Sequence, residues 1–214
     1  ASQLEVEIAA VGVSGMGPCV LLADDADEPV RPAILYGVDT RATAQIDRMT
    51  DELGVAEITR VGGSTLTTQA GGPKIVWIAD EEPAAYAAAR RLFMPASWLA
   101  RHLTGAYVLD HQSASQVSPL YDVEREEWHA DNWARYAPGI EAPRLLWAGD
   151  IAGQVTDAAA AATGLPAGIP VIAGTIDAWS EAVSVGAHEF GDLMLMYGTS
   201  MFLVATGTET LRTP

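Results

Sequence analysis

Residues 157–184 constrain the fold more than any other stretch, because helix, strand and helix patterns follow one another within it. It begins with Asp157 and a run of alanines, a helix pattern that Gly164 ends. The apolar residues 170–174 then have the length and composition of a strand, and the segment AWSEAVSVG after Asp177 has the pattern of the next helix. This alternation predicts an α/β protein.

The rest of the chain continues the same alternation of short apolar runs and helices. One strand is expected within 8–16. Within 20–39 we expect two further apolar stretches of strand character, separated by an acidic turn. Helices are expected over 41–53, over AAYAAARRLF and over ASWLARHLTG, whereas 61–72 is typical of a Gly/Thr loop and Lys74–Ile78 fits either a strand or a helix. Two apolar runs near the C-terminus predict a buried hairpin, so we expect a mixed sheet flanked by helices.

Composition excludes several classes of function. The formal net charge of −16 and the scattered 12 basic residues argue against a nucleic-acid partner, because phosphate contacts need clustered Lys and Arg. No apolar run is long enough to cross a membrane, and the opening ASQLEVEIAA carries acids where a signal peptide carries basic residues. We therefore expect a cytoplasmic protein without a membrane partner. With Cys19 as its single cysteine and no histidines at ligand spacing, the sequence predicts no metal site of its own.

Asp177 is the first candidate for chemistry. It follows a buried strand and a glycine-bearing turn in the sequence GTIDA, a position from which a carboxylate can accept a proton from a bound hydroxyl. An alternative is that Asp177 only caps the helix that follows, since Asp is among the best N-cap residues.

The small-residue turn Gly198-Thr199-Ser200 is the second candidate. Its backbone N–H groups and two hydroxyls would let a phosphate oxygen approach closely. An ordinary hairpin turn explains the same residues equally well.

Asp39 and Arg41 form the third candidate. They lie two residues apart after a strand, so both can point to one side and hold the hydroxyls of a polyol. A surface ion pair is the alternative, and the spacing does not separate the two.

Taken in order, several stretches resemble the FGGY carbohydrate kinases, particularly the xylulokinase-like branch. These stretches are VGVSGMG, RPAILYGVDTRA, GPKIVWI followed by EEPAAY, HLTGAYVLDHQSAS, ATGLPAGIPVIAGTIDA and GDLMLMYGTS, and they cover almost the whole chain. The resemblance implies the actin-like ATPase (ribonuclease H-like) fold. Residues 1–190 would be most of the sugar-binding N-terminal domain, and 191–214 the opening hairpin of the nucleotide-binding domain.

The resemblance also implies a reaction, the ATP-dependent phosphorylation of a sugar or polyol hydroxyl, with a xylulose-like ketose as the first candidate. Asp177 would be the general base. Gly198, Thr199 and Ser200 would face the phosphates of ATP, which acts with Mg²⁺. Met16, Asp39 and Arg41 would line the sugar site. Such a transfer needs positioning and charge neutralisation more than covalent help from the protein.

Departures from the family pattern shape further expectations. The family's Gly-x-Asp-x-Gly-Thr phosphate hairpin and its adenosine-binding domain are absent from these 214 residues, so we expect no ATP turnover by this polypeptide alone. Gly17 and Ala178 stand where xylulokinases usually carry His and Asn, which leaves the sugar open. Without the rest of the second domain, the hairpin would expose LMLMY and MFLVA unless it docks on another surface, so we expect self-association as a homodimer. Alternatives are a non-catalytic sugar-binding or regulatory protein on the same fold, and an actin-like ATPase with a protein client.

Overall fold

Short strands pair two by two along the chain in the computed structural model, which describes residues 7–198, 201–209 and 211–212. Two pairs are parallel, namely β1 (Ser14–Gly15) with β10 (Thr175–Ile176), and β4 (Val108–Asp110) with β7 (Arg144–Leu146). The antiparallel pairs are β2 (Leu21–Ala23) with β3 (Arg91–Phe93), β5 (Tyr121–Asp122) with β6 (Glu127–Trp128), β8 (Ile151–Gln154) with β9 (Pro170–Ile172), and β11 (Leu193–Tyr197) with β12 (Met201–Ala205). Parallel and antiparallel pairing therefore coexist, as the sequence predicts for an α/β protein.

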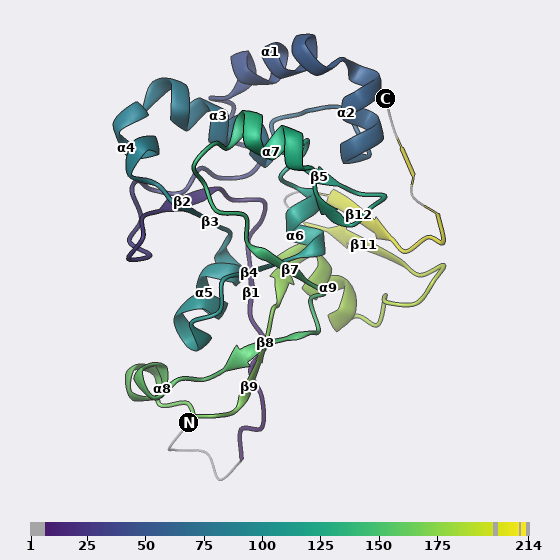
Figure 1. Cartoon of the computed structure of the whole chain (residues 1–214). Coiled ribbons are helices and arrows are strands. Elements are labelled where there is room, and N and C mark those ends of the chain that lie inside the picture. The colour runs from purple at the N-terminus through teal and green to yellow at the C-terminus, as the bar shows by residue number, and fades with distance from the viewer. Residues whose placement is uncertain (1–6, 199–200, 210, 213–214) are drawn as a thin grey trace.

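Helices alternate with these strands and pack around them (Figure 1). They are α1 (Thr43–Leu53), α2 (Val55–Gly62), α3 (Gly71–Glu81), α4 (Pro83–Ala88), α5 (Pro95–Thr104), α6 (His111–Ser115), α7 (Ala130–Tyr136), α8 (Asp157–Thr163) and α9 (Asp177–Ser184). The predicted glycine endings are confirmed at α5 and α8, where Gly105 and Gly164 adopt φ of 76°. A positive φ of this kind suits glycine and ends a helix.

One helix prediction is wrong in its second half. The segment AAYAAARRLF was expected to be helical throughout, but α4 ends at Ala88 and Arg91–Phe93 forms strand β3. The reason is tertiary: Leu92 pairs with Leu22 of β2, and both side chains are fully buried. Helix propensity is a weak preference that such packing overrides. Pro95 occupies the first turn of α5, a position that suits proline.

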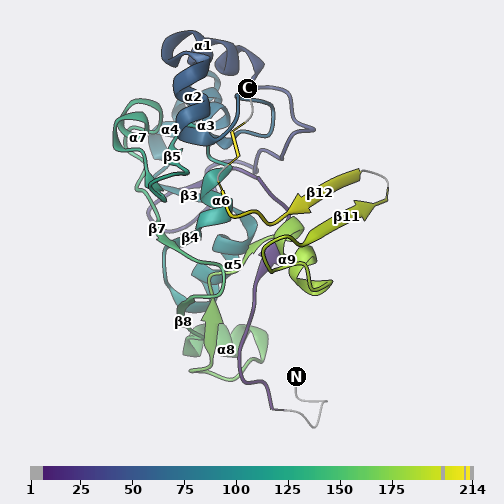
Figure 2. The same cartoon turned by 90° about the vertical axis from the view of Figure 1, so that its right-hand side faces the viewer.

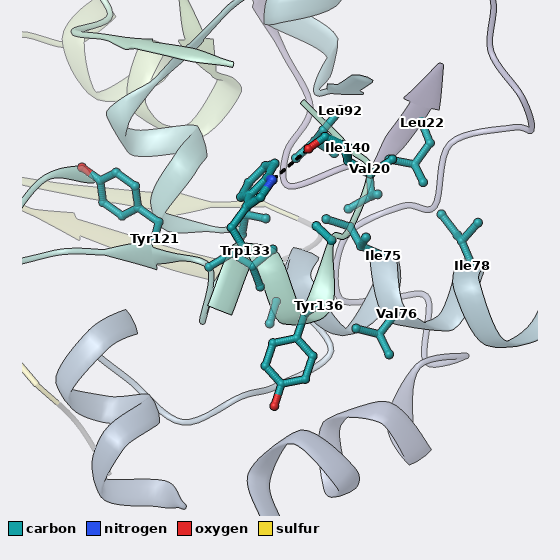
Figure 3. Packing of buried hydrophobic residues seen from close by; sticks show 14 of the residues in the cluster. Val20, Leu22, Ile75, Val76, Ile78, Leu92, Tyr121, Trp133, Tyr136 and Ile140 are labelled. Atoms are coloured by element: carbon teal, nitrogen blue, oxygen red, sulfur yellow. Dashed lines mark hydrogen bonds between the residues drawn. The ribbon is translucent and has the colours of Figure 1, made fainter. Parts of the chain in front are cut away.

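Two apolar cores hold the elements together. The larger core lies among α1, α2, α3, α7 and the strands β2 to β4, and Figure 3 shows part of it, with Trp133 donating a 2.9 Å hydrogen bond to the Ile140 carbonyl. The smaller core gathers small and branched side chains from α5, α8, β8 and β9, including Ala100 and Val171. The N-terminal segment runs past β8 and β9, so that β1 lies near the middle of the molecule (Figure 1).

The hairpin β11–β12 projects from the body beside α9 (Figure 2). Helix α9 contacts β12, and Met194 on the inner face of the hairpin is buried. The opposite face carries exposed apolar side chains, and Met194 is the only buried residue of the two described strands, so the prediction of a buried hairpin is wrong for most of it. Among the helices that the structure describes, none combines the length and the apolar character that crossing a bilayer would require.

Candidate functional site

A cavity of about 570 Å³ lies where the end of β1, the start of α9 and the hairpin β11–β12 meet. Its wall is built from segments far apart in the sequence. The residues that line it are Met16, Gly17, Pro18, Tyr36, Gln69, Gln116, Ile176, Asp177, Ala178, Trp179, Glu181, Met196, Gly198, Met201 and Phe202. Three of the predicted site residues, Met16, Asp177 and Gly198, therefore share one cavity.

Asp177 is placed by the parallel pairing of β10 with β1, in which Thr175 lies opposite Ser14 and Ile176 opposite Gly15. A buried hydrogen bond of 2.7 Å from Thr175 Oγ1 to the Asp110 carboxylate anchors the same strand to the start of α6. Asp177 then begins α9, half-buried at the cavity wall. The fold thus delivers this carboxylate at the junction of a buried strand and a helix.

The capping alternative for Asp177 can now be compared with its contacts. The cap position of α9 is occupied by Ile176, and Asp177 is the first residue of the helix itself. Its Oδ1 accepts a 2.9 Å hydrogen bond from the N–H of Ala178, and no other described residue hydrogen-bonds its carboxylate. The side chain consequently stabilises the first turn while keeping acceptor capacity for a ligand.

The hairpin β11–β12 supplies another part of the cavity wall. Gly198 lines it together with Met196, Met201 and Phe202 from the two strands. Thr199 and Ser200, predicted with Gly198 to face phosphates, lie outside the described residues. Their role stays a prediction.

Asp39 and Arg41 form a two-pronged ion pair with each other. Nε of Arg41 donates to Oδ1 of Asp39 at 2.8 Å, and Nη2 donates to Oδ2 at 2.8 Å. These hydrogen bonds hold the pKa of Asp39 below its ordinary value, outweighing its partial burial. The guanidinium also lies over the ring of Trp77, 4.8 Å from its centroid.

This ion pair lines a second hollow of about 530 Å³, separate from the cavity that holds Asp177. The two hollows share one loop, because the N–H of Asp39 donates to the carbonyl of Tyr36, and Tyr36 lines the cavity. The contacts within the pair match the ion-pair alternative. A role for Asp39 and Arg41 in holding the sugar stays a prediction that the geometry does not test.

Lys74 also binds this loop. Its side chain is 1% exposed, and Nζ donates a 2.6 Å hydrogen bond to the carbonyl of Leu35. Burial lowers the pKa of Lys74, although the charge of Asp39 acts in the opposite direction. Lys74 therefore fixes the backbone just before Tyr36.

Several residues of the cavity wall were not predicted from the sequence, notably Tyr36, Gln69, Gln116, Trp179 and Glu181. For Glu181 a signal was present, because residues four apart on a helix share a face and Asp177 is its partner at that spacing. Gln69 and Gln116 come from loops that only the tertiary fold brings together, joined by a 2.7 Å bond from the N–H of Gly71 to the Gln116 carbonyl. No local pattern marks them.

No group of three or more His, Cys, Asp or Glu side chains gathers at metal-binding distance within the part of the chain that the structure describes. Cys19 is buried, and burial raises the pKa of its thiol. A thiol of raised pKa is a poor metal ligand and nucleophile. The described lining of the cavity includes carboxylates, amides and aromatic side chains.

Comparison with known proteins gives this cavity a context. The profile of the FGGY family of carbohydrate kinases, N-terminal domain, matches residues 2–184. A xylulose kinase of Streptomyces coelicolor is 32% identical over 206 residues, which cover 91% of this chain and 40% of that protein. An L-xylulose/3-keto-L-gulonate kinase of Escherichia coli is 32% identical over 200 residues, 90% of this chain and 39% of that protein.

A solved structure shows the same arrangement of elements. The crystal structure of xylulose kinase from Rhodospirillum rubrum is similar with a TM-score of 0.90 and 27% identity, over 98% of this chain and 43% of that one. The chain spans about 40% of the length of the curated relatives it matches.

Proposed function

The chain belongs to the FGGY family of carbohydrate kinases, and on this premise we propose that it supplies the sugar-binding cavity and the general base of an ATP-dependent kinase. The reaction is the phosphorylation of a sugar or polyol hydroxyl, with a xylulose-like ketose as the first substrate to test. One observation carries the proposal: Asp177 and Gly198, which are far apart in the sequence, line the same cavity.

In this mechanism the sugar binds with one hydroxyl beside the carboxylate of Asp177. As the hydroxyl oxygen forms a bond to the γ-phosphorus of ATP, its proton passes to Asp177 and the bond from phosphorus to the β–γ bridging oxygen breaks, releasing ADP. General-base assistance of this kind contributes about 10²- to 10⁴-fold in rate. The half-buried position of Asp177 supports the role, since it limits competition from water.

The nucleotide and its metal ion fit the chemistry of the cavity wall. Gly198 would leave space for a phosphate oxygen beside backbone groups, and the phosphates of ATP would supply most of the oxygen ligands that Mg²⁺ prefers. Mg²⁺ is usually held by one or two carboxylates together with substrate phosphates. When bound, the ion neutralises charge on the phosphates during transfer.

The same proposal includes the binding partner of the protein and its place in the cell. A small-molecule sugar or polyol is the partner, nucleic acid and membranes are not, and the enzyme works in the cytoplasm. The net charge of −16 supports the exclusion of nucleic acid, because the overall field repels phosphate chains.

The test is a coupled assay of ADP release over a panel of ketoses and polyols, run on the protein as its gene encodes it. We expect sugar-dependent ADP release that Asp177→Asn lowers by about 10²- to 10⁴-fold. The matched control is Asp131→Asn, an exposed carboxylate in the first turn of α7. Full activity of the Asp177 variant contradicts the assignment of the base. A folded protein that binds sugar without releasing ADP is instead a sugar-binding protein.

A further inference from the structure

Glu181 places a second carboxylate on the wall of the Asp177 cavity. It lies four residues after Asp177 on α9, so the two side chains share a helix face, and both line the cavity. Glu181 is half-buried, and its carboxylate makes no hydrogen bond or ion pair with any residue that the structure describes. Its acceptor oxygens are therefore available to a ligand.

Among the described residues that line the cavity, no basic side chain balances these two carboxylates. None of the described lining residues is Lys, Arg or His. Arg41, the cation predicted for the sugar site, is bound to Asp39 in a separate hollow. Lys74 is buried and donates to the carbonyl of Leu35.

The remaining polar groups are neutral. Gln69 and Gln116 reach the cavity from separate loops, and Tyr36 adds a phenol. Oε1 of Gln69 accepts a 3.1 Å hydrogen bond from the N–H of Gly37, which fixes the orientation of this amide. Amides and carboxylates together accept and donate hydrogen bonds to hydroxyl groups, but they offer no charge partner to an acid.

We propose that Glu181 is a specificity-determining residue that selects neutral polyhydroxy substrates and rejects sugar acids. The inference rests on the proposed kinase function and names its substrate class. Hydroxyl groups donate to the carboxylate of Glu181, whereas the carboxylate of an aldonate is repelled by it. Discrimination by a repulsive charge against the wrong ligand is a common source of specificity.

The experiment compares each neutral ketose or polyol with the aldonate of the same carbon number, using the protein as its gene encodes it. Repulsion between two charges a few ångströms apart changes binding by roughly tenfold or more. We therefore expect kcat/KM to favour the neutral member by at least about tenfold, and Glu181→Gln to shrink this preference by about tenfold. Glu81→Gln, an exposed carboxylate at the end of α3, is the control and should leave the ratio unchanged.

A second readout separates this inference from the proposed function. Calorimetric binding of the same substrate pairs without nucleotide should show the same preference and the same loss in Glu181→Gln; Glu181→Ala provides a second variant.

A parent protein that prefers the aldonate, or a ratio unchanged in both variants, overturns the inference. So does a variant that raises the KM for ATP equally with every sugar, since Glu181 then serves the nucleotide. Absence of ADP release with every sugar defeats the kinase proposal, while calorimetry still decides selectivity.

Discussion

Gly17 packs directly against Ile176, because a Cβ atom on residue 17 would lie only 2.2 Å from Cγ2 of Ile176. Ile176 ends strand β10 and caps the helix that begins with Asp177. The missing side chain at Gly17 thus allows the segment after β1 to approach the strand that delivers the candidate base. Met16 and Asp177 reach one cavity through this contact.

Substitution of Gly17 should disturb this junction. In Gly17→Ala the added methyl group overlaps Ile176, and overpacking of this kind costs about 1–3 kcal/mol of unfolding free energy. We expect a lower denaturation midpoint and, in the enzyme assay, a loss of activity because Asp177 shifts with its strand. Gly149→Ala is the matched control, since a Cβ there meets nothing within 4 Å. Equal stability of the two variants would show that Ile176 yields freely.

The bond between Thr175 and Asp110 should stabilise the same strand. Thr175→Val keeps the shape of the side chain but removes the hydroxyl that donates to the buried Asp110 carboxylate at 2.7 Å. Leaving a buried acceptor with fewer partners costs about 1–3 kcal/mol. Denaturant unfolding measures the loss, with exposed Thr208→Val as the control. An unchanged midpoint would mean that another group satisfies Asp110.

Asp27 should make stability depend on acid pH. Burial alone would raise its pKa, but hydrogen bonds from Arg101 and Arg91, each 2.7 Å long, outweigh it and hold the pKa below its ordinary value. A depressed pKa contributes stability that is complete above the unfolded pKa of about 3.9 and disappears as pH falls through the folded pKa.

The variant Asp27→Asn removes the charge and tolerates the positive φ of 64° at this position, as Asn does generally. We expect it to be less stable than the parent by about 1.5–3 kcal/mol at neutral pH. The gap should begin to narrow below about pH 4, where the unfolded chain takes up a proton, and close only when the pH falls through the lower pKa of the folded parent. Thermal unfolding from pH 7 to pH 3 measures the stability difference, and Asp25→Asn, at an exposed position, is the control. A gap that does not change with pH would assign the effect to packing.

The hairpin should drive self-association of this polypeptide into a homodimer. Its outer face exposes Leu195 opposite Leu203 and Tyr197 opposite Met201, all more than half exposed. Exposed apolar stripes of this kind favour burial against another protein surface. Sedimentation velocity over a range of concentrations should show a dimer that Leu195→Lys weakens, while Leu211→Lys, also at an exposed position, does not. A sharp monomer at high concentration contradicts the prediction.

The elements that the sequence predicted correctly depend mainly on residues close together along the chain. The helices over 43–53 and 157–163 and their glycine endings follow from spacing and from the conformational freedom of glycine, so the structure confirms them. The strand, turn and helix around Asp177 also follow from the pattern of residues close together in the sequence. The α/β class follows from the order of these units.

Tertiary structure decided the rest. Arg91–Phe93 became a strand because β2 lies beside it, although its own residues favour a helix. The separation of Asp39 and Arg41 from the Asp177 cavity, and the arrival of Gln69 and Gln116 at its wall, depend on loops that pack across the chain. The physical reason is that helix turns and caps are set by neighbours within a few residues, whereas the wall of a cavity is set by contacts between segments that no local pattern relates.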